Sequence, residues 1–257
     1  MSKELKNGFL DKDILFEMGK IQNEHKELYN VLKEINHLFY RIEKNYEIVN
    51  PTDVDLYVRT VFSQLHISFQ TYIILLEIGL YDDSQVILRS MYDKISKCIY
   101  AIGNNDVKGL ENQSIEKTLL LYEYIYDTKL YEYLPKDNLQ IYTDLLKNKK
   151  KENGENNRVP RIATIFKNSS IPEAYIHYSL LSSYVHNAIS VVSSKIIEDD
   201  LGITINQNID HGDFKNEIGK MVICMQYVVD PVCKFLKLEK ENICFKELVN
   251  KMLIIIE

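Results

Sequence analysis

The sequence predicts an all-α protein, a helical bundle with a long N-terminal heptad-patterned helix. Five prolines and nine glycines are few for a chain of 257 residues, which argues against the many tight turns of an all-β sandwich or barrel. Apolar residues make up 46% of the chain and recur at the three- and four-residue steps of helix faces. A chain of this length is also long enough to bury a substantial core.

The first predicted helix begins near Ile14 and is about 35 residues long, or about 50 Å. Its apolar seam alternates steps of three and four residues, and His25 fills the only gap. The seam consists of Ile14, Met18, Ile21, Leu28, Leu32, Ile35, Phe39, Ile42 and Tyr46. It must pack along another long helix, which could belong to the same chain or to a second subunit. We therefore assign residues 1–50 to packing or dimerisation and residues 51–257 to the bundle domain.

Helices are also predicted for most of the remaining chain. Thr52 or Asp53 caps the second helix, since both side chains accept hydrogen bonds from free backbone N–H groups. Stop residues and apolar spacing place the helices at residues 52–80, 83–102, 113–132, 136–148, 161–167, 172–198, 212–237 and 241–256. The segment LGITINQNIDHGD, residues 201–213, is the only one compatible with extended structure, and we interpret it as a connecting loop.

Residues 147–161, KNKKKENGENNRVPR, are predicted to form a flexible basic loop. They contain six basic and two acidic residues, which gives a local charge of +4. Such a run is usually a solvated loop, but it is also suited to contact with a phosphate backbone. The chain as a whole carries a charge of −6, which argues against a surface coated with nucleic acid and leaves room for one basic patch.

Several classes of protein lack their motifs in this sequence. The four cysteines are far apart, with no C-x-x-C pair, so we expect core residues rather than a zinc site or disulfides. Neither a P-loop nor a Rossmann glycine motif is present. His66 lies within an apolar helix and is predicted to be a hydrogen-bonded core histidine. No segment resembles a signal peptide or a membrane span, so we expect a cytoplasmic protein without membrane contact, metal or cofactor.

The predicted helix of residues 172–198 has two chemically different sides. Tyr175, Ser179, Ser182, His186 and Ser193 follow steps of three, four and seven residues and therefore share one side. The opposite side is apolar. Because a buried hydroxyl or imidazole without a partner is costly, the polar side should face polar groups of other helices or water in a cleft.

A second polar feature lies in the predicted helix of residues 83–102. Arg89 and Asp93 stand four residues apart among apolar neighbours, a spacing that permits an ion pair within the helix. On a mostly apolar helix such a pair holds the guanidinium fork in a fixed orientation. The fork can recognise a phosphate or serve a structural role.

Two short motifs in these helices carry a resemblance to known families. R-S-x-x-D spans Arg89 to Asp93, and S-x-x-x-H spans Ser182 to His186. In this order they resemble the R-S-x-x-E and S-x-x-x-H helices of an uncharacterised bacterial all-helical family. The chain is also distantly similar to the HEPN superfamily, the higher eukaryotes and prokaryotes nucleotide-binding domains.

The HEPN resemblance implies a metal-independent ribonuclease or a partner of a nucleotidyltransferase, often in phage defence or toxin–antitoxin systems. HEPN proteins use an R-x4-6-H motif on one helix. This chain departs from the motif, because residues 180–182 upstream of His186 are Leu-Leu-Ser. If the resemblance holds, Arg89 would have to supply the cation from another helix.

The first functional hypothesis is metal-independent cleavage of RNA. His186 would act as general base or acid on the 2′-hydroxyl, Arg89 would bind the scissile phosphate and stabilise its developing charge, and Asp93 would orient Arg89. This site requires that the two helices converge.

Binding of the RNA or nucleotide would involve residues around these catalytic groups. Ser182, Tyr184 and Asn187 follow the same helix as His186, while Arg158 and Arg161 belong to the predicted basic loop. The alternative hypothesis is a non-catalytic binding or sensor module. In that case the Arg/Asp/Ser/His cluster is structural or binds a small anion, and the N-terminal helix forms a homodimer or recruits a partner protein.

Overall fold

The computed structural model describes residues 14–44, 50–128, 136–154, 159–185, 196–199, 202–205 and 213–257. These residues form ten α-helices and one two-stranded hairpin, which confirms the predicted all-α bundle. The helices are α1 (Ile14–Glu24), α2 (Lys26–Lys44), α3 (Asp53–Glu77), α4 (Tyr81–Asn104), α5 (Lys108–Asp127), α6 (Lys136–Asn153), α7 (Ile162–Lys167), α8 (Ala174–Val185), α10 (Phe214–Phe235) and α11 (Glu239–Ile256). The strands are β1 (Ile196–Asp199) and β2 (Gly202–Ile205).

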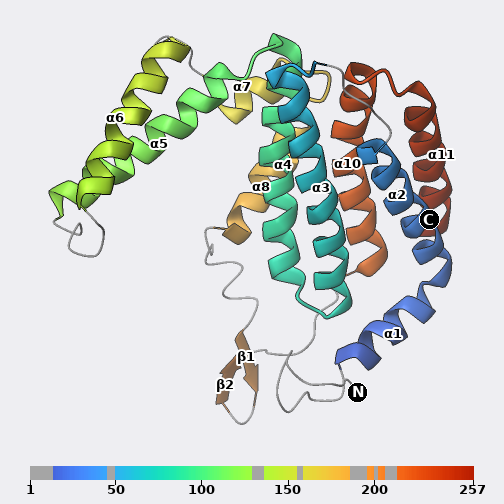
Figure 1. Ribbon diagram of the computed structural model, residues 1–257. Helices are drawn as coiled ribbons and strands as arrows, with labels where there is room; N and C mark the ends of the chain where they lie inside the picture. Colours follow the sequence, from blue (N-terminus) through green and yellow to red (C-terminus); the bar gives the residue numbers. More distant parts are fainter. Residues whose placement is uncertain are drawn as a thin grey trace.

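Helix α4 occupies the centre of the arrangement (Figure 1). It packs against α3 and α10 on one side and against α7 and α8 on another, while α2 and α11 pack together next to α3 and α10. Helices α5 and α6 form a hairpin that extends away from the other helices (Figure 1). The core fills the space between α2, α3, α4, α10 and α11, where apolar side chains are almost fully buried.

The N-terminal seam is covered within the same chain. Its residues on α2, such as Leu32, Ile35 and Phe39, are buried, and α2 packs against α11 and α3. This part of the seam therefore does not require a second subunit.

The prediction of one continuous N-terminal helix is wrong, because the helix is divided at His25 into α1 and α2. The backbone hydrogen bonds continue, from the His25 N–H to the Ile21 oxygen and from the Tyr29 N–H to the His25 oxygen, both at 3.0 Å. The His25 ring stacks on Phe214 of α10 with the ring centroids 5.0 Å apart. Figure 1 shows α1 turned to a different direction from α2.

The start of α3 agrees with the predicted cap. The Thr52 hydroxyl accepts from the backbone N–H of Asp55, and the Asp55 carboxylate accepts from the backbone N–H of Thr52, at 3.1 and 3.0 Å. This reciprocal pair is a capping box, which satisfies two backbone donors at the helix end.

The predicted basic loop is wrong for residues 147–153, which continue α6. The reason lies in α5, where acidic side chains compensate the lysines. Lys150 pairs with Glu116 at 2.8 Å, and Lys149 pairs with Glu111 at 3.4 Å. These partners are more than 30 positions away in the sequence, so a local count of charge does not reveal them.

The segment after α8 also differs from the prediction. The expected helix does not include residues 196–198, which belong to β1, and part of the expected loop forms β2. The strands are antiparallel and pair Ile196 with Ile205 and Ile197 with Thr204. Three consecutive β-branched residues in β2, at positions 203–205, favour an extended backbone over a helix.

The cysteines are core residues, as predicted. Cys98, Cys224 and Cys233 are buried, Cys244 is half-buried, and all four are free thiols. Among the described residues, no helix combines the length and the apolar character that crossing a bilayer requires.

A buried polar network joins α3, α4 and α10 within the core. Glu217 is only 3% exposed, and its Oε2 accepts from the Tyr72 hydroxyl and from the Gln85 amide, each at 3.0 Å. Lys220 donates to the other carboxylate oxygen. Burial, followed by the neighbouring Glu217 charge, raises the pKa of Tyr72, so its hydroxyl stays a neutral donor. Each group in the network thus has a partner, which removes the usual penalty of a buried charge.

Replacing Glu217 by alanine should lower the free energy of unfolding by about 3 kcal/mol, because the Tyr72 hydroxyl and the Gln85 amide lose a common acceptor. Glu217→Gln should cost less, since its amide oxygen still accepts. Urea denaturation measures both, with Glu247→Ala, an exposed acidic residue of α11, as the control. Equal stability of Glu217→Ala and the control would contradict the role of the network.

Asp230 connects α10 to α11 and predicts a pH dependence. Its partial burial opposes ionisation, but hydrogen bonds from Lys234, Asn242 and Lys246 outweigh burial and lower its pKa to about 2. A lowered pKa in the folded state means that the stabilisation is complete above the ordinary pKa of 3.8 and is lost as the pH falls toward 2.

Wild-type protein should therefore lose about 1 kcal/mol more stability between pH 5 and pH 2 than the Asp230→Asn variant. Thermal unfolding as a function of pH measures the difference. Asp127→Asn, which changes an exposed aspartate of α5, should follow the wild-type curve. If Asp230→Asn follows that curve as well, Asp230 does not contribute in this way.

Candidate functional site

Four polar residues follow one another along α4 at intervals of four positions: Gln85, Arg89, Asp93 and Lys97. Each step of four residues turns about 40° around a helix axis, so the row winds slowly around α4. Gln85 bonds to Glu217 of α10, and Arg89 contacts Tyr178 of α8. Further along, Asp93 and Lys97 line a cavity next to α5 and α7. The row therefore runs from the core network to an open site.

Arg89 is the centre of the contact between α4 and α8. Its Nη1 donates to Asp93 Oδ2 at 2.8 Å and its Nη2 donates to the Tyr178 hydroxyl at 2.5 Å. The guanidinium carbon also lies 4.5 Å from the centroid of the Tyr178 ring, within the range of a cation–π contact. The Arg89 side chain is 18% exposed and that of Asp93 is 30% exposed. The predicted intrahelical ion pair is present, in a partly buried setting.

Arg89 retains donors beyond these two bonds. A guanidinium has five N–H donors, and two are used here. The Arg89 Nε is buried and has no hydrogen-bond partner among the described residues. Partial burial, and then the Asp93 charge, raises the pKa of Tyr178 against the opposing effect of Arg89, so the phenol keeps its proton at neutral pH.

Helix α8 packs against α4, and among its described side chains Ala174 and Leu181 are buried, next to the half-buried Tyr178 and Ser182. Ser179, which was predicted to share the polar side with Ser182, is exposed.

Tyr178 meets Arg89, and the half-buried Ser182 donates to the Tyr178 backbone oxygen at 3.0 Å. Ser182 thus forms a bond within its own helix, which is a local structural role. Ile176 and Leu180 on the other side are 61% and 66% exposed.

Three of the predicted site residues, His186, Asn187 and Arg158, lie outside the described residues, as does the side chain of Tyr184. The convergence of α4 and α8 is observed, whereas the approach of His186 to Arg89 stays a prediction. His186 follows Val185, the last residue of α8, directly in the chain.

Arg89, Asp93 and Tyr178 together form what we call the Arg89 cluster. A cavity of about 340 Å³ opens beside this cluster, between α4, α5, α7 and α8. Its polar and aromatic lining includes Asp93, Lys97, Lys117, Arg161, Tyr175 and Tyr178. Arg161 was predicted as a binding residue, and the structure places it at this cavity, just before α7. Arg161 of the predicted loop and Asp93 of the predicted helix pair therefore line the same cavity.

Lys97 and Lys117 were not among the predicted site residues. Neither lysine, nor Arg161, forms a hydrogen bond or an ion pair through its side chain with another described residue, so three cationic groups around this cavity are uncompensated. Lys97 continues the four-residue spacing of Arg89 and Asp93, and this signal could have identified it. Lys117 lies on α5 and could be identified only from the fold.

His66 has the structural role that was predicted. It is 5% exposed, its Nδ1 lies 2.9 Å from Glu43 Oε1, and its Nε2 lies 2.8 Å from Asn36 Oδ1. These bonds join α2 to α3. In the described part of the chain, His, Cys, Asp and Glu side chains form no group of three that could hold a metal ion.

Comparison with known proteins gives one match. The pattern of a family of unknown function, DUF5677, matches residues 55–203, which is more than half of the chain and includes α4 and α8. No curated protein and no solved structure matches. The match confirms the expected membership of an uncharacterised family. The likeness to the HEPN superfamily stays a prediction. The chain therefore belongs to the DUF5677 family of unknown function.

Proposed function

We propose that this protein is a HEPN-like helical module that binds RNA through its phosphate backbone and cleaves it without a metal ion, in the setting of phage defence or a toxin–antitoxin system. The observation that supports it is the cavity beside the Arg89 cluster, where Lys97, Lys117 and Arg161 have no compensating partner among the described residues. Cations in such a position favour phosphate oxygens.

The local charge of this cavity stands out against the chain as a whole. The net charge is −6, so most of the surface repels a polyanion. Among the described residues that line the cavity, Asp93 is the only one with a carboxylate, and it is already paired with Arg89. A phosphate that approaches here meets cations without meeting an uncompensated carboxylate.

Cleavage would use Arg89 and His186 in different roles. Asp93 and Tyr178 hold the guanidinium fork in place before any substrate arrives, which is the preorganisation that stabilises a developing phosphate charge effectively. His186 would act as general base or acid on the 2′-hydroxyl, and Ser182, Tyr184 and Asn187 would lie near the substrate on the same segment.

Binding is tested by fluorescence polarisation with a labelled single-stranded RNA. Arg161→Ala and Lys117→Ala should each weaken binding several-fold and reduce the slope of log affinity against log salt concentration by about 1. Lys33 is an exposed lysine of α2 that does not line the cavity, so Lys33→Ala should bind RNA as the wild-type protein does. Equal affinity of all four proteins would reject this cavity as the RNA site.

Cleavage is tested separately with a pooled RNA substrate in the presence of a chelator. Wild-type protein should cut the RNA, and His186→Ala and Arg89→Ala should lose activity at least 100-fold while remaining folded. Binding without any cleavage by the wild-type protein would reject the catalytic part and retain the RNA-binding part.

A second candidate function is a non-catalytic module in which the cluster only holds α4 against α8. The double contact of Arg89 with Tyr178, through the hydroxyl and through the ring, favours it. Tyr178→Phe keeps the ring and removes the acceptor, so it should lower the free energy of unfolding by about 1 kcal/mol.

Tyr175→Phe is the matched control, because Tyr175 lies on the same helix and is 40% exposed. Chemical denaturation compares the two variants. If Tyr178→Phe is as stable as Tyr175→Phe, the hydroxyl contact does not hold the helices together, and the structural reading of the cluster is contradicted.

A further inference from the structure

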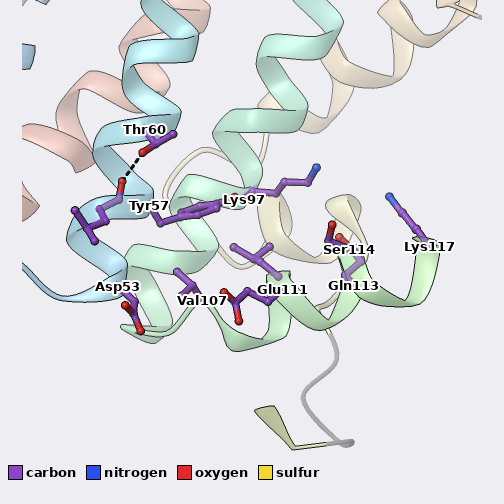
Figure 2. A pocket seen from close by; sticks show the side chains of 11 residues that line it. Asp53, Tyr57, Thr60, Lys97, Val107, Glu111, Gln113, Ser114 and Lys117 are labelled. Carbon is purple, nitrogen blue, oxygen red and sulfur yellow. Dashed lines mark hydrogen bonds between the residues drawn. The ribbon is translucent and has the colours of Figure 1, made fainter. Parts of the chain in front are cut away.

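A second and larger cavity, of about 550 Å³, lies between α3, α4 and the first half of α5 (Figure 2). Leu56, Tyr57 and Thr60 come from α3, while Leu110 and Ser114 come from α5. None of these five lines the cavity beside Arg89. The two cavities have only Lys97, Gln113 and Lys117 in common, so they adjoin each other along one wall.

One end of this cavity is cationic and polar. Figure 2 shows Lys97 and Lys117 reaching from α4 and α5 toward the same side of the cavity. The Gln113 amide and the Tyr57 hydroxyl also line it, and within the described part of the chain no side chain or backbone group bonds to either. Burial raises the pKa of Tyr57 to about 12, so this phenol is a neutral donor.

The wall between α3 and α5 is apolar. It is formed by the side chains of Leu56, Val107 and Leu110 and by the ring of Tyr57, which extends from α3 toward Lys97 (Figure 2). An apolar wall with a few convergent polar groups, in a volume of this size, is typical of small-molecule sites.

The other end is acidic. In Figure 2 Asp53 and Glu111 lie on the side away from the ammonium groups of the two lysines, with Val107 between them. Glu111 is already engaged by Lys149 and Asn153 of α6, at 3.4 and 2.9 Å. The cavity therefore attracts negative charge at the lysine end. At the other end the Asp53 carboxylate, which has no bonding partner among the described residues, disfavours a second anionic group of the ligand.

We infer that this cavity binds a small organic anion with a flat apolar body, whose charged group lies between Lys97 and Lys117 and whose body lies against Tyr57 and Leu56. Inorganic phosphate satisfies only the first requirement. The inference does not depend on the proposed RNA function, because Leu56, Tyr57 and Thr60 belong to this cavity alone and Arg161 and Tyr178 belong to the other.

The test uses the full chain and the fluorescent anion 8-anilinonaphthalene-1-sulfonate as the probe. Wild-type protein should bind it saturably at one site. Lys97→Ala and Lys117→Ala should each weaken the affinity at least fivefold, and Thr60→Trp, which places an indole in the cavity, should weaken it at least tenfold.

Two matched variants serve as controls. Lys33→Ala changes an exposed lysine elsewhere. Thr71→Trp changes another threonine of α3 whose hydroxyl bonds to the carbonyl four residues earlier, as that of Thr60 does, but which does not line the cavity. Both should bind the probe as wild type does. Thermal melts establish that each variant is folded.

Competition distinguishes the natural ligand chemistry. Displacement of the probe by adenosine monophosphate but not by naphthoate would identify a nucleotide, and the reverse would identify an aromatic carboxylate. If inorganic phosphate displaced the probe as effectively as the organic anions, the role of the apolar wall would be overturned. Unchanged probe affinity in Lys97→Ala, Lys117→Ala and Thr60→Trp would overturn the inference, whereas weaker RNA binding by Arg161→Ala alone would leave the proposed function standing.

Discussion

The enclosure of α4 by its neighbours is the constraint on which the structure depends. A helix that packs against α3, α7, α8 and α10 must place each polar side chain opposite a group that can accept or donate a bond. The row of Gln85, Arg89, Asp93 and Lys97 meets this requirement by turning about 40° at each step. Gln85 bonds to the Glu217 carboxylate and Arg89 bonds to the Tyr178 hydroxyl, whereas Asp93 and Lys97 line an open cavity.

The two ends of this row differ in what the surroundings supply. At Gln85 the partners Tyr72 and Glu217 are buried, so the polar atoms fix how α3, α4 and α10 align. At Lys97 no described residue supplies a partner, so the charge is left to solvent or to a bound anion. The four-residue spacing along α4 thus places a structural contact at Gln85 and an unpaired cation in an open cavity at Lys97.

Much of the fold follows from local pattern. The Thr52 cap, the approximate positions of α3, α4, α10 and α11 and the burial of the α2 seam could be predicted, because spacing and capping act over a few residues. The break at His25 could not, since the seam continues through it and the stacking partner, Phe214, is distant in the sequence. The helical state of residues 147–153 was missed for the same reason, because Glu111 and Glu116 lie on another helix.

The candidate site could be predicted only in part. The ion pair of Arg89 with Asp93 follows from their spacing, but its third member, Tyr178, comes from a segment 89 positions away. Both cavities form where helices meet. The sequence of α4 or of α5 alone therefore does not indicate that Lys97 and Lys117 line the same cavities.

Lys97 and Lys117 line both cavities, so binding of the two proposed ligands would be coupled. Two anions bound on opposite sides of the same two ammonium groups would repel each other. Each would also be attracted less strongly, because the other anion already neutralises part of the positive charge. By thermodynamic linkage, a ligand in one cavity would weaken binding in the other, and its own affinity would fall by the same factor. The common wall would then make a small metabolite an antagonist of RNA, with no change of shape required.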